Sequence, residues 1–281
     1  MTGRENSPAI PEAAWVSALP WPGIDAHKHS RGRLGVVSGG ALSTGAARLA
    51  ARAGLRIGAG LVRIFCPPDA ASVVAGAVEA VMVAEFATPD GLARLAEPFD
   101  AVVIGPAAGL TETTAQNLAA LGRTGAVLIV DADALTLFKG RARELFDHLD
   151  RDDVLTPHEG EFERLFPGLL AEGRQTAARI AAERAGAVVV LKGPATVIAA
   201  PDGRLAVNPN GSPWLATAGS GDVLAGMIGG LAAQHMDSFD AACAAAWMHA
   251  DAARRFGPGL TAGDLPEQIP AVLASLWPGD A

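Results

Sequence analysis

Apolar residues recur along the chain in two patterns, which alternate from about residue 34 onward. In the first, consecutive apolar residues form a short run, as in residues 101–104 and 187–191. In the second, small and apolar residues recur at helical spacing over a longer segment, as in residues 44–58. The first pattern is typical of strands buried on both faces, and the second of helices packed on a core. Their alternation predicts an α/β fold, a three-layer α/β/α sandwich with a mainly parallel sheet.

The two patterns place the expected elements. Strands are expected at residues 34–38, 61–65, 81–84, 101–104, 126–130, 154–155, 187–191, 196–199 and 204–207. Helices are expected at residues 44–58, 70–77, 91–97, 111–122, 134–138, 174–185, 223–233, 239–256 and 265–276, with a further helix starting near residues 158–161. The last two strands should form a hairpin across Pro201-Asp202-Gly203.

No linker or internal repeat divides the chain, so residues 23–281 are predicted to form a single catalytic domain. Residues 1–22 are polar, contain proline and show no clear period. They are expected to form an N-terminal arm, either packed on the surface or partly disordered.

Many of the predicted strands are followed by turns that carry glycine or polar side chains. In a parallel sheet these turns lie at the carboxyl edge, where α/β proteins bind ligands. We therefore expect a ligand site built from the turns at residues 39–40, 105–109, 131–133, 156–161 and 192–193. Within them, Asp133 either faces a ligand or caps the next helix. Lys192 either contacts a phosphate or ribose, or is a solvated lysine at a strand end.

The stretch from Asn208 to Gly230 joins an irregular Gly/Pro/Asn-rich loop to an apolar helix. At the junction, the backbone N–H groups of Gly219, Ser220 and Gly221 meet the positive end of the helix dipole and form a predicted anion hole. Asp222 beside them has two interpretations. It caps the helix, or it is a general base that takes a proton from a substrate hydroxyl attacking phosphorus.

Composition restricts the function further. Thirty acidic residues against 22 basic ones give a net charge of −8, which argues against a nucleic-acid partner. Cys66 and Cys243 lie in apolar segments and are expected to be buried thiols in a reducing cytoplasm. No signal pattern and no apolar run long enough to cross a bilayer is evident, so no membrane role is expected. The basic cluster at His27–Arg33 is either a solvated turn or a contact for an anionic ligand.

Six segments in order resemble those of the ADP/ATP-dependent NAD(P)H-hydrate dehydratases, the repair branch of the ribokinase-like superfamily. The resemblance runs from about Gly23 to Leu276 and matches the stand-alone form. The segments read GG-x₄-GAA with Gly60 after it, IGPAAG, VDADAL, LTPHEGEFERL, VVLKGPATVI and NPNGSPWLATAGSGDVLAGMIGGLAA.

The resemblance implies a ribokinase-like fold and a lyase that dehydrates (6S)-NADHX or NADPHX, the hydrated forms of the cofactors, with ADP or ATP as co-substrate and Mg²⁺ bridging the phosphates. It implies that Asp222 is the catalytic base. The hydrate would contact Ala46, Gly109, His158 and Asp222. The nucleotide would contact Lys192, Gly193, Pro194, Ala195, Thr196 and Gly221. It further implies a homo-oligomer, often a tetramer, for which the alanine-rich helix around residues 241–253 offers a contact.

This sequence departs from the family pattern at a few positions. The turn usually written GPGLG reads GPAAG here, which places alanine where glycine is usual and narrows the approach of the backbone to a ligand. The junction usually written GTGD reads GSGD. The chain has no tyrosine, so a ring that stacks on a ligand must come from another residue. Trp214 is either a ligand wall or a buried anchor for its loop.

Two other functions are compatible with these residues. A small-molecule kinase of the same superfamily, of the thiazole or hydroxymethylpyrimidine kinase type, would use the same aspartate and anion hole but leave the phosphate on its product. A nucleotide sensor without catalysis would keep the fold but would not need the base. Assays with the hydrate and with Asp222→Asn separate these functions.

Overall fold

The computed structural model describes residues 14–279, and its centre is a nine-stranded sheet in the order β3-β2-β1-β4-β5-β6-β7-β8-β9. Strands β1 to β7 pair in parallel, and the β8–β9 hairpin adds two antiparallel strands at one edge. The strands are Arg33–Val37, Leu61–Cys66, Met82–Glu85, Ala101–Ile104, Val127–Val130, Val154–Leu155, Val188–Leu191, Thr196–Ala199 and Leu205–Asn208. The predicted mainly parallel sheet and its hairpin are confirmed.

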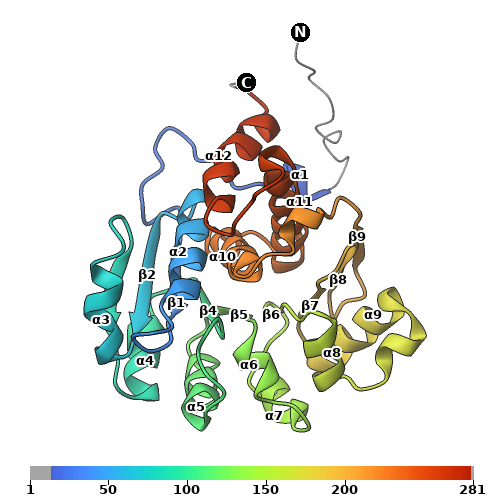
Figure 1. The fold of residues 1–281 in the computed structure, drawn as a ribbon, viewed down its shortest axis with the longest axis horizontal. Helices are drawn as coiled ribbons and strands as arrows, with labels where there is room; N and C mark the ends of the chain where they lie inside the picture. Colours follow the sequence, from blue (N-terminus) through green and yellow to red (C-terminus); the bar gives the residue numbers. More distant parts are fainter. Residues whose placement is uncertain (1–13, 280–281) are drawn as a thin grey trace.

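Helices cover both faces of the sheet and give the three layers visible in Figure 1. One face carries α1 (Ala14–Ser17), α2 (Gly45–Arg56), α10 (Ser220–Ala233), α11 (Ser238–Phe256) and α12 (Leu265–Leu276). The remaining helices are α3 (Pro68–Ala75) near the β3 edge, and α4 (Pro89–Ala96), α5 (Glu112–Leu121), α6 (Asp133–Thr136), α7 (Ala142–Phe146), α8 (Glu159–Leu165) and α9 (Arg174–Ala185) across the other face.

Each apolar strand contributes to two cores, because successive side chains of a strand point to opposite faces of the sheet. In β4, Ala101 and Val103 pack in the core under α2 and α10, whereas Val102 and Ile104 pack in the core on the α5 side. This arrangement explains why these strands are apolar at every position rather than at alternate ones.

The contact between α2 and α10 depends on glycines. A Cβ added to Gly226 would lie 2.1 Å from the carbonyl oxygen of Ala50, and one added to Gly230 would lie 2.4 Å from Cγ2 of Ile57. The two helices therefore pack backbone against backbone, and this close packing fixes where the first turn of α10 lies.

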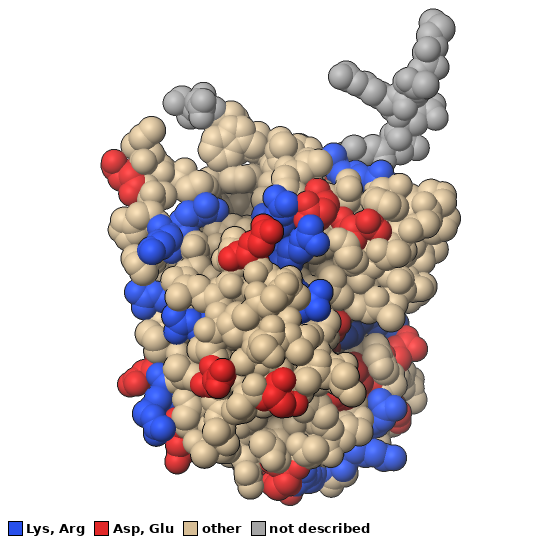
Figure 2. Space-filling model, turned by 60° about the vertical axis from the view of Figure 1, so that its left-hand side comes forward, with Lys and Arg blue, Asp and Glu red and all other residues tan. Residues whose placement is uncertain are grey.

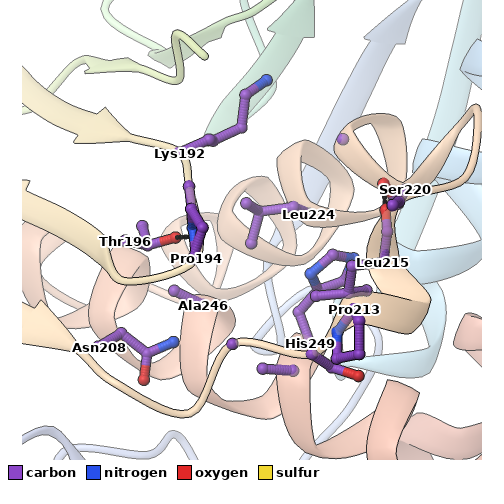
Figure 3. Close-up of a pocket in the computed structure, with 16 residues that line it drawn as sticks. Lys192, Pro194, Thr196, Asn208, Pro213, Leu215, Ser220, Leu224, Ala246 and His249 are labelled. Atoms are coloured by element: carbon purple, nitrogen blue, oxygen red, sulfur yellow. Dashed lines mark hydrogen bonds between the residues drawn. The ribbon is translucent and has the colours of Figure 1, made fainter. Parts of the chain in front are cut away.

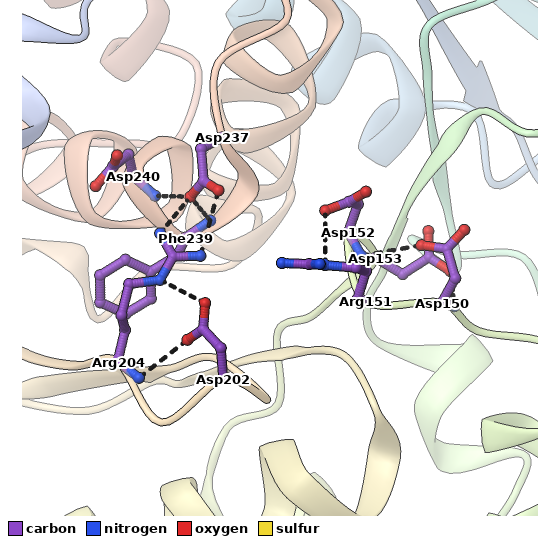
Figure 4. A network of polar contacts seen from close by, with 9 residues as sticks. All are labelled: Asp150, Arg151, Asp152, Asp153, Asp202, Arg204, Asp237, Phe239 and Asp240. Carbon is purple, nitrogen blue, oxygen red and sulfur yellow. Dashed lines mark hydrogen bonds and ion pairs between the residues drawn. The ribbon is translucent and has the colours of Figure 1, made fainter.

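A polar network ties the β8–β9 turn to the start of α11 (Figure 4). Arg204 forms ion pairs of 2.9 Å with Asp202 in the turn and with Asp237, and its guanidinium lies 4.8 Å from the ring centre of Phe239. Asp237 also caps α11, since its carboxylate accepts hydrogen bonds from the N–H groups of Phe239 and Asp240. The network holds the edge hairpin against α11, the helix that packs on it.

Some elements differ from the predictions. Helix α10 begins at Ser220, three residues before the predicted start, so the interpretation of Asp222 as the N-cap is wrong: the cap position belongs to Gly219, at φ +91°. Helix α7 and a 3₁₀ turn, Leu169–Glu172, were not predicted, because each is too short to show a helical period. The predicted oligomer contact on α11 is also wrong, since residues 241–253 are buried within the chain.

The N-terminal segment packs on α11, and the basic cluster lies at the amino edge of the sheet. The predicted arm of residues 1–22 is described only from residue 14, where Trp15 is buried with its ring 5.8 Å from that of Trp247. The His27–Arg33 cluster precedes β1 at the amino edge, where Arg33 donates hydrogen bonds to Asp100 and to the carbonyl of Pro98. The two thiols are buried as expected, and burial raises the pKa of Cys66 to about 11 and of Cys243 to about 12.

The surface shows acidic and basic side chains intermixed and separated by uncharged stretches on the face in Figure 2. Among the described residues, no helix has both the length and the apolar character needed to cross a bilayer.

Candidate active site

A buried ion pair marks the carboxyl edge of the sheet. Asp131 follows β5 and Lys192 follows β7, and the Lys192 ammonium nitrogen lies 2.7 Å from Oδ1 of Asp131. The hydroxyl of Thr156, which follows β6, donates to the same oxygen at 2.8 Å. The three neighbouring strands therefore bring together side chains that lie far apart in the sequence.

The ion pair belongs to a charged cluster in which acids outnumber bases. Burial alone would lower the pKa of Lys192, but the carboxylates of Asp131, Glu161 and Asp222 outweigh it and hold the pKa above its ordinary value. Lys192 is therefore charged at neutral pH, and its side chain is 20% exposed, which leaves part of it accessible to a ligand.

Asp222 lies in the first turn of α10 within reach of this cluster. Burial is the largest cause that raises its pKa, the charges of Asp131 and Asp133 also raise it, and Lys192 lowers it; the net result is a pKa of about 6. A carboxylate whose pKa lies just below neutral is ionised at pH 7 and still binds a proton readily. Asp222 therefore has the properties of a general base.

The first turn of α10 also presents free backbone donors. The N–H of Ser220 donates to the carbonyl of Thr217 at 3.4 Å. The N–H groups of Gly221 and Asp222 follow it in the first turn, where a helix has no internal acceptor for them. A Cβ on Gly221 would lie 3.4 Å from Nζ of Lys192, so this turn faces the lysine closely. The helix dipole adds partial positive charge, and the arrangement suits a phosphate oxygen.

A cavity of about 530 Å³ opens next to this turn (Figure 3). Its volume is within the range of small-molecule sites. Its polar lining includes Lys192, Thr196 and Ser220, and Thr196 and Ser220 lie on opposite sides of the cavity in Figure 3. The rest of the wall is largely apolar and includes Pro213, Leu215, Leu224, Ala246 and Ala250. A molecule that combines an anionic group with a flat apolar group matches this mixed lining.

The structure brings most of the residues predicted to contact a nucleotide into one place. Lys192, Gly193, Pro194, Thr196 and Gly221 all line the cavity, whereas Ala195 is not among its lining residues. Trp214 is 41% exposed and does not line the cavity either, so neither interpretation of this residue is supported.

The turn that contains Gly109 packs against the same edge. Gly109, at φ +85°, donates its N–H to Oδ2 of Asp133 at 2.8 Å, so Asp133 binds this turn rather than acting as N-cap of α6. Ala107, one of the two alanines that distinguish this chain, adopts φ +53°, which costs about 1–2 kcal/mol for a residue with a Cβ. The carbonyl oxygen of Ala107 lies so close to Gly39 that a Cβ added to Gly39 would be 2.1 Å from it. The predicted turns at residues 39–40 and 105–109 therefore pack against each other.

The other two residues predicted to contact the hydrate lie on helix starts. His158 caps α8, because its Nδ1 accepts hydrogen bonds from the N–H groups of Gly160 and Glu161, and 55% of its side chain is exposed. A β-bridge to Lys192 holds it beside the cluster. Ala46 lies in the first turn of α2, one turn before Leu49, whose side chain packs close to Gly219.

Within the part of the chain that the structure describes, no protein-held metal site is evident. The residues from 14 to 279 contain no group of three or more His, Cys, Asp or Glu side chains arranged to hold an ion. Asp131 is paired with Lys192, and one oxygen of Asp133 is occupied by Gly109. Mg²⁺ commonly reaches such sites on substrate phosphates with one or two carboxylates, not in an all-protein cage.

Sequence reasoning missed two features of this site. The pairing of Lys192 with Asp131 and Glu161, and the hydrogen bond from Thr156 to Asp131, were not predicted, because pairing across strands gives no local signal. His249 on α11 was also missed, although it lines the cavity and is 5% exposed. A single histidine within an alanine-rich helix was the only available signal.

Comparisons with known proteins agree with this geometry. The family model described as NAD(P)H-hydrate dehydratase matches residues 34–273. The bifunctional NAD(P)H-hydrate repair enzyme Nnr of Salinibacter ruber is 39% identical over 96% of this chain and 53% of its own length. The ADP-dependent (S)-NAD(P)H-hydrate dehydratase of Neisseria meningitidis is 38% identical over 87% of this chain and 84% of its own. This chain thus spans about half the length of the bifunctional relatives that it matches.

A solved structure supports the fold. The ADP/ATP-dependent NAD(P)H-hydrate dehydratase from Bacillus subtilis, co-crystallized with ATP/Mg²⁺, superimposes with a TM-score of 0.80 at 28% identity. The superposition covers 94% of this chain and 96% of the other. The ribokinase-like α/β/α sandwich is therefore confirmed.

Proposed function

Because the chain belongs to the NAD(P)H-hydrate dehydratase family, we propose that it converts (6S)-NADHX or NADPHX to NADH or NADPH at the expense of ADP or ATP. With ADP the products are AMP and phosphate, and with ATP they are ADP and phosphate. The observation that carries the proposal is the carboxylate of Asp222, with its pKa raised to about 6, in the turn that also offers free N–H donors.

The first step is phosphoryl transfer to the hydrate. Asp222 removes the proton from the hydroxyl on the hydrated nicotinamide ring, and the oxygen attacks the terminal phosphorus of the nucleotide. The bond from that phosphorus to the bridging oxygen breaks, and AMP or ADP leaves. The N–H groups of the Gly219–Gly221 turn and the ammonium of Lys192 stabilise the charge that develops on the phosphoryl oxygens.

The second step is elimination. The lone pair of the ring nitrogen expels phosphate from the neighbouring carbon, and loss of a proton from the adjacent carbon restores the dihydronicotinamide. The apolar part of the cavity wall supports these steps, since it keeps bulk water away from the transferring phosphoryl group.

The metal is proposed to arrive with the co-substrate. When bound with ADP or ATP, Mg²⁺ would supply neutralisation of the charge on the phosphates, as in other phosphoryl-transfer enzymes. The chain's own contribution is then the ammonium of Lys192 and the first turn of α10.

The test is an assay that follows the absorbance of reduced nicotinamide when the protein is mixed with NADHX and ADP, with ATP in parallel. The unmodified protein should restore NADH. Asp222→Asn should lower kcat by roughly 100-fold or more, because loss of a general base typically costs that much. Asp90→Asn is the matched control. It neutralises an aspartate in an exposed surface pair with Arg123 and should leave the rate unchanged.

The same assay separates the competing functions. A stable phosphorylated product without recovery of NADH would identify a small-molecule kinase. Nucleotide turnover that survives Asp222→Asn would show that Asp222 is not the base. Nucleotide binding with no turnover at all would identify a sensor.

We also propose that residues 23–281 act as a single catalytic domain in the cytoplasm, and that the chain assembles as a homo-oligomer, the tetramer implied by the resemblance. Because residues 241–253 of α11 are buried within the chain, the contact must use other surfaces. Sedimentation of the purified protein measures the assembly.

A further inference from the structure

Asn208, the last residue of β9, brings a side-chain amide without a partner to the cavity. The residue lines the cavity and is 8% exposed. Neither the oxygen nor the nitrogen of its amide makes a hydrogen bond to any residue from 14 to 279, yet neither is sealed from solvent, in contrast to Oδ1 of Asn210. A largely buried amide without a partner is unfavourable, so this amide is placed to bond with a ligand in the cavity.

Thr196 adds a second polar group beside this amide. It pairs with Asn208 across the β8–β9 ladder, so the two side chains project to the same face of the hairpin. Thr196 also lines the cavity, and its hydroxyl donates to the carbonyl of Gly193 at 3.2 Å, which leaves the hydroxyl oxygen free to accept. In Figure 3 the two side chains lie on the same side of the cavity. The pair therefore offers one donor group and two acceptor oxygens, all uncharged, to a ligand.

The position of this pair indicates which part of a nucleotide it meets. In the proposed function the phosphates lie between Lys192 and the first turn of α10. The ribose is bonded directly to the phosphates, and the wall of the cavity continues from Lys192 through Thr196 to Asn208. Pro213 and Leu215 lie on the other side of the cavity in Figure 3, where they suit the apolar faces of a base. The uncharged polar pair thus matches the two ribose hydroxyls.

We propose that Asn208 is a specificity-determining residue that binds the ribose of the nucleotide. Its amide nitrogen donates a hydrogen bond to one ribose hydroxyl, and its amide oxygen accepts one from the neighbouring hydroxyl. This inference rests on the proposed function, which places ADP or ATP in the cavity, and it names the part of the co-substrate that this wall recognises. A nucleotide without the 2′ and 3′ hydroxyls leaves the amide buried without a partner and is bound less tightly.

A ligand series with the unmodified protein is the first test. Calorimetry should give ADP an affinity about 10- to 100-fold higher than that of 2′,3′-dideoxy-ADP, the usual consequence of leaving a buried polar group unsatisfied. IDP, which differs from ADP only in its base, provides the comparison for base recognition. Equal affinities for ADP and 2′,3′-dideoxy-ADP would overturn the proposal.

Variants of Asn208 test the residue itself. Asn208→Leu keeps the size of the side chain but removes both hydrogen-bonding groups. It should lower the affinity for ADP about 10-fold or more and change that for 2′,3′-dideoxy-ADP little, so that the preference is lost. Asn208→Ala fits within the space of the asparagine and should give the same result if the leucine variant does not fold.

Two outcomes with these variants would refute the proposal. The first is an unchanged preference for ADP over 2′,3′-dideoxy-ADP. The second is loss of a preference for ADP over IDP while the ribose preference persists, because the amide would then read the base.

Asn210→Leu is the matched control, since it makes the same substitution in the same loop. Asn210 lies outside the lining of the cavity, and its Nδ2 donates to the carbonyl of Trp247 at 3.0 Å. Loss of this bond should lower the melting temperature but keep the preference for ADP over 2′,3′-dideoxy-ADP. The same loss of preference in Asn210→Leu would show that the loop as a whole, and not the Asn208 amide, decides the selectivity, and it would refute the proposal.

Binding is measured without hydrate, so this proposal and the proposed function can fail separately. Ribose selectivity that depends on Asn208, in a protein that does not dehydrate NADHX, would refute the dehydratase alone. Dehydration with a ribose preference insensitive to Asn208 would refute this inference alone. A protein that binds no nucleotide would refute both.

Discussion

The chemistry of Asp222 depends on charges that belong to other residues. An aspartate in water is almost fully ionised at pH 6, whereas burial and the charges of Asp131 and Asp133 bring the pKa of Asp222 to about that value. Lys192 limits the rise. The result is a carboxylate that is basic enough to accept a proton and still ionised at neutral pH.

This environment predicts how activity depends on pH. Asp222 works in its ionised form, so kcat/KM should be constant above about pH 7 and fall about tenfold per pH unit below about pH 6. Asp131→Asn removes a charge that raises the pKa of Asp222, and it should move the midpoint of the acid limb to lower pH. The measurement is a pH–rate profile of each protein with NADHX and ADP.

The direction of this shift is the critical result. Asparagine at position 131 keeps a side-chain oxygen that can accept a hydrogen bond from Lys192, so this hydrogen bond can replace the ion pair. A midpoint that moves to higher pH in the variant, or an acid limb absent from both proteins, would contradict the role given to Asp222.

Individual site residues were predictable from the sequence only where they belong to a local motif. The glycine-rich turn that contains Asp222 is such a motif, and so is the strand end at Lys192. Lys192 and Asp131 lie 61 positions apart, and neither segment carries a sequence signal that predicts their ion pair. His249 was hidden for a different reason: an alanine-rich helix predicts burial but not which side chain faces a cavity.

At the scale of elements, the site depends on how α10 sits against α2. The strands were predictable because they are short, continuous apolar runs, and most helices because their apolar residues recur at helical spacing. The start of α10 was not, because a helix that begins with Ser220-Gly221-Asp222 has weak local propensity. Tertiary packing decides it, since Gly226 and Gly230 let α10 approach α2 closely and carry its first turn to the carboxyl edge of the sheet.

Gly226→Ala should therefore separate the two helices. The added Cβ would lie 2.1 Å from the carbonyl oxygen of Ala50 and 2.6 Å from its Cα. The free energy of unfolding should fall by about 1–3 kcal/mol, the usual cost of overpacking a core, and kcat should fall with it because the catalytic turn moves. Chemical denaturation and the dehydratase assay measure the two effects.

Gly45→Ala is the matched control for that change. Gly45 is also helical, in the first turn of α2, but no atom lies within 4 Å of the Cβ it would gain. Its replacement should leave stability unchanged or raise it by a few tenths of a kcal/mol. Equal losses in both variants would show that the close approach of α10 to α2 is not what glycine provides at position 226.

At the scale of the whole molecule, the cavity is a junction between segments that are distant in the chain. Its walls come from residues 192–196, the loop at 208–216, the start of α10 and the middle of α11. The Arg204 network fixes one of these walls by tying the β8–β9 turn to α11. A ligand in the cavity thus contacts both the edge hairpin and the helical layer.

A nucleotide that binds this junction should stabilise the entire fold, because it binds the native chain and not the unfolded one. At 100 times its Kd, ADP should add about 2.7 kcal/mol to the free energy of unfolding, and the melting temperature should rise by roughly 5 °C. Asp222→Asn should keep this shift even though it loses turnover, because the proposed base acts on the hydrate's proton and not on nucleotide binding. Thermal melting of both proteins with and without ADP is the measurement. A shift lost in Asp222→Asn would make Asp222 a nucleotide-binding group and leave the reaction without its base.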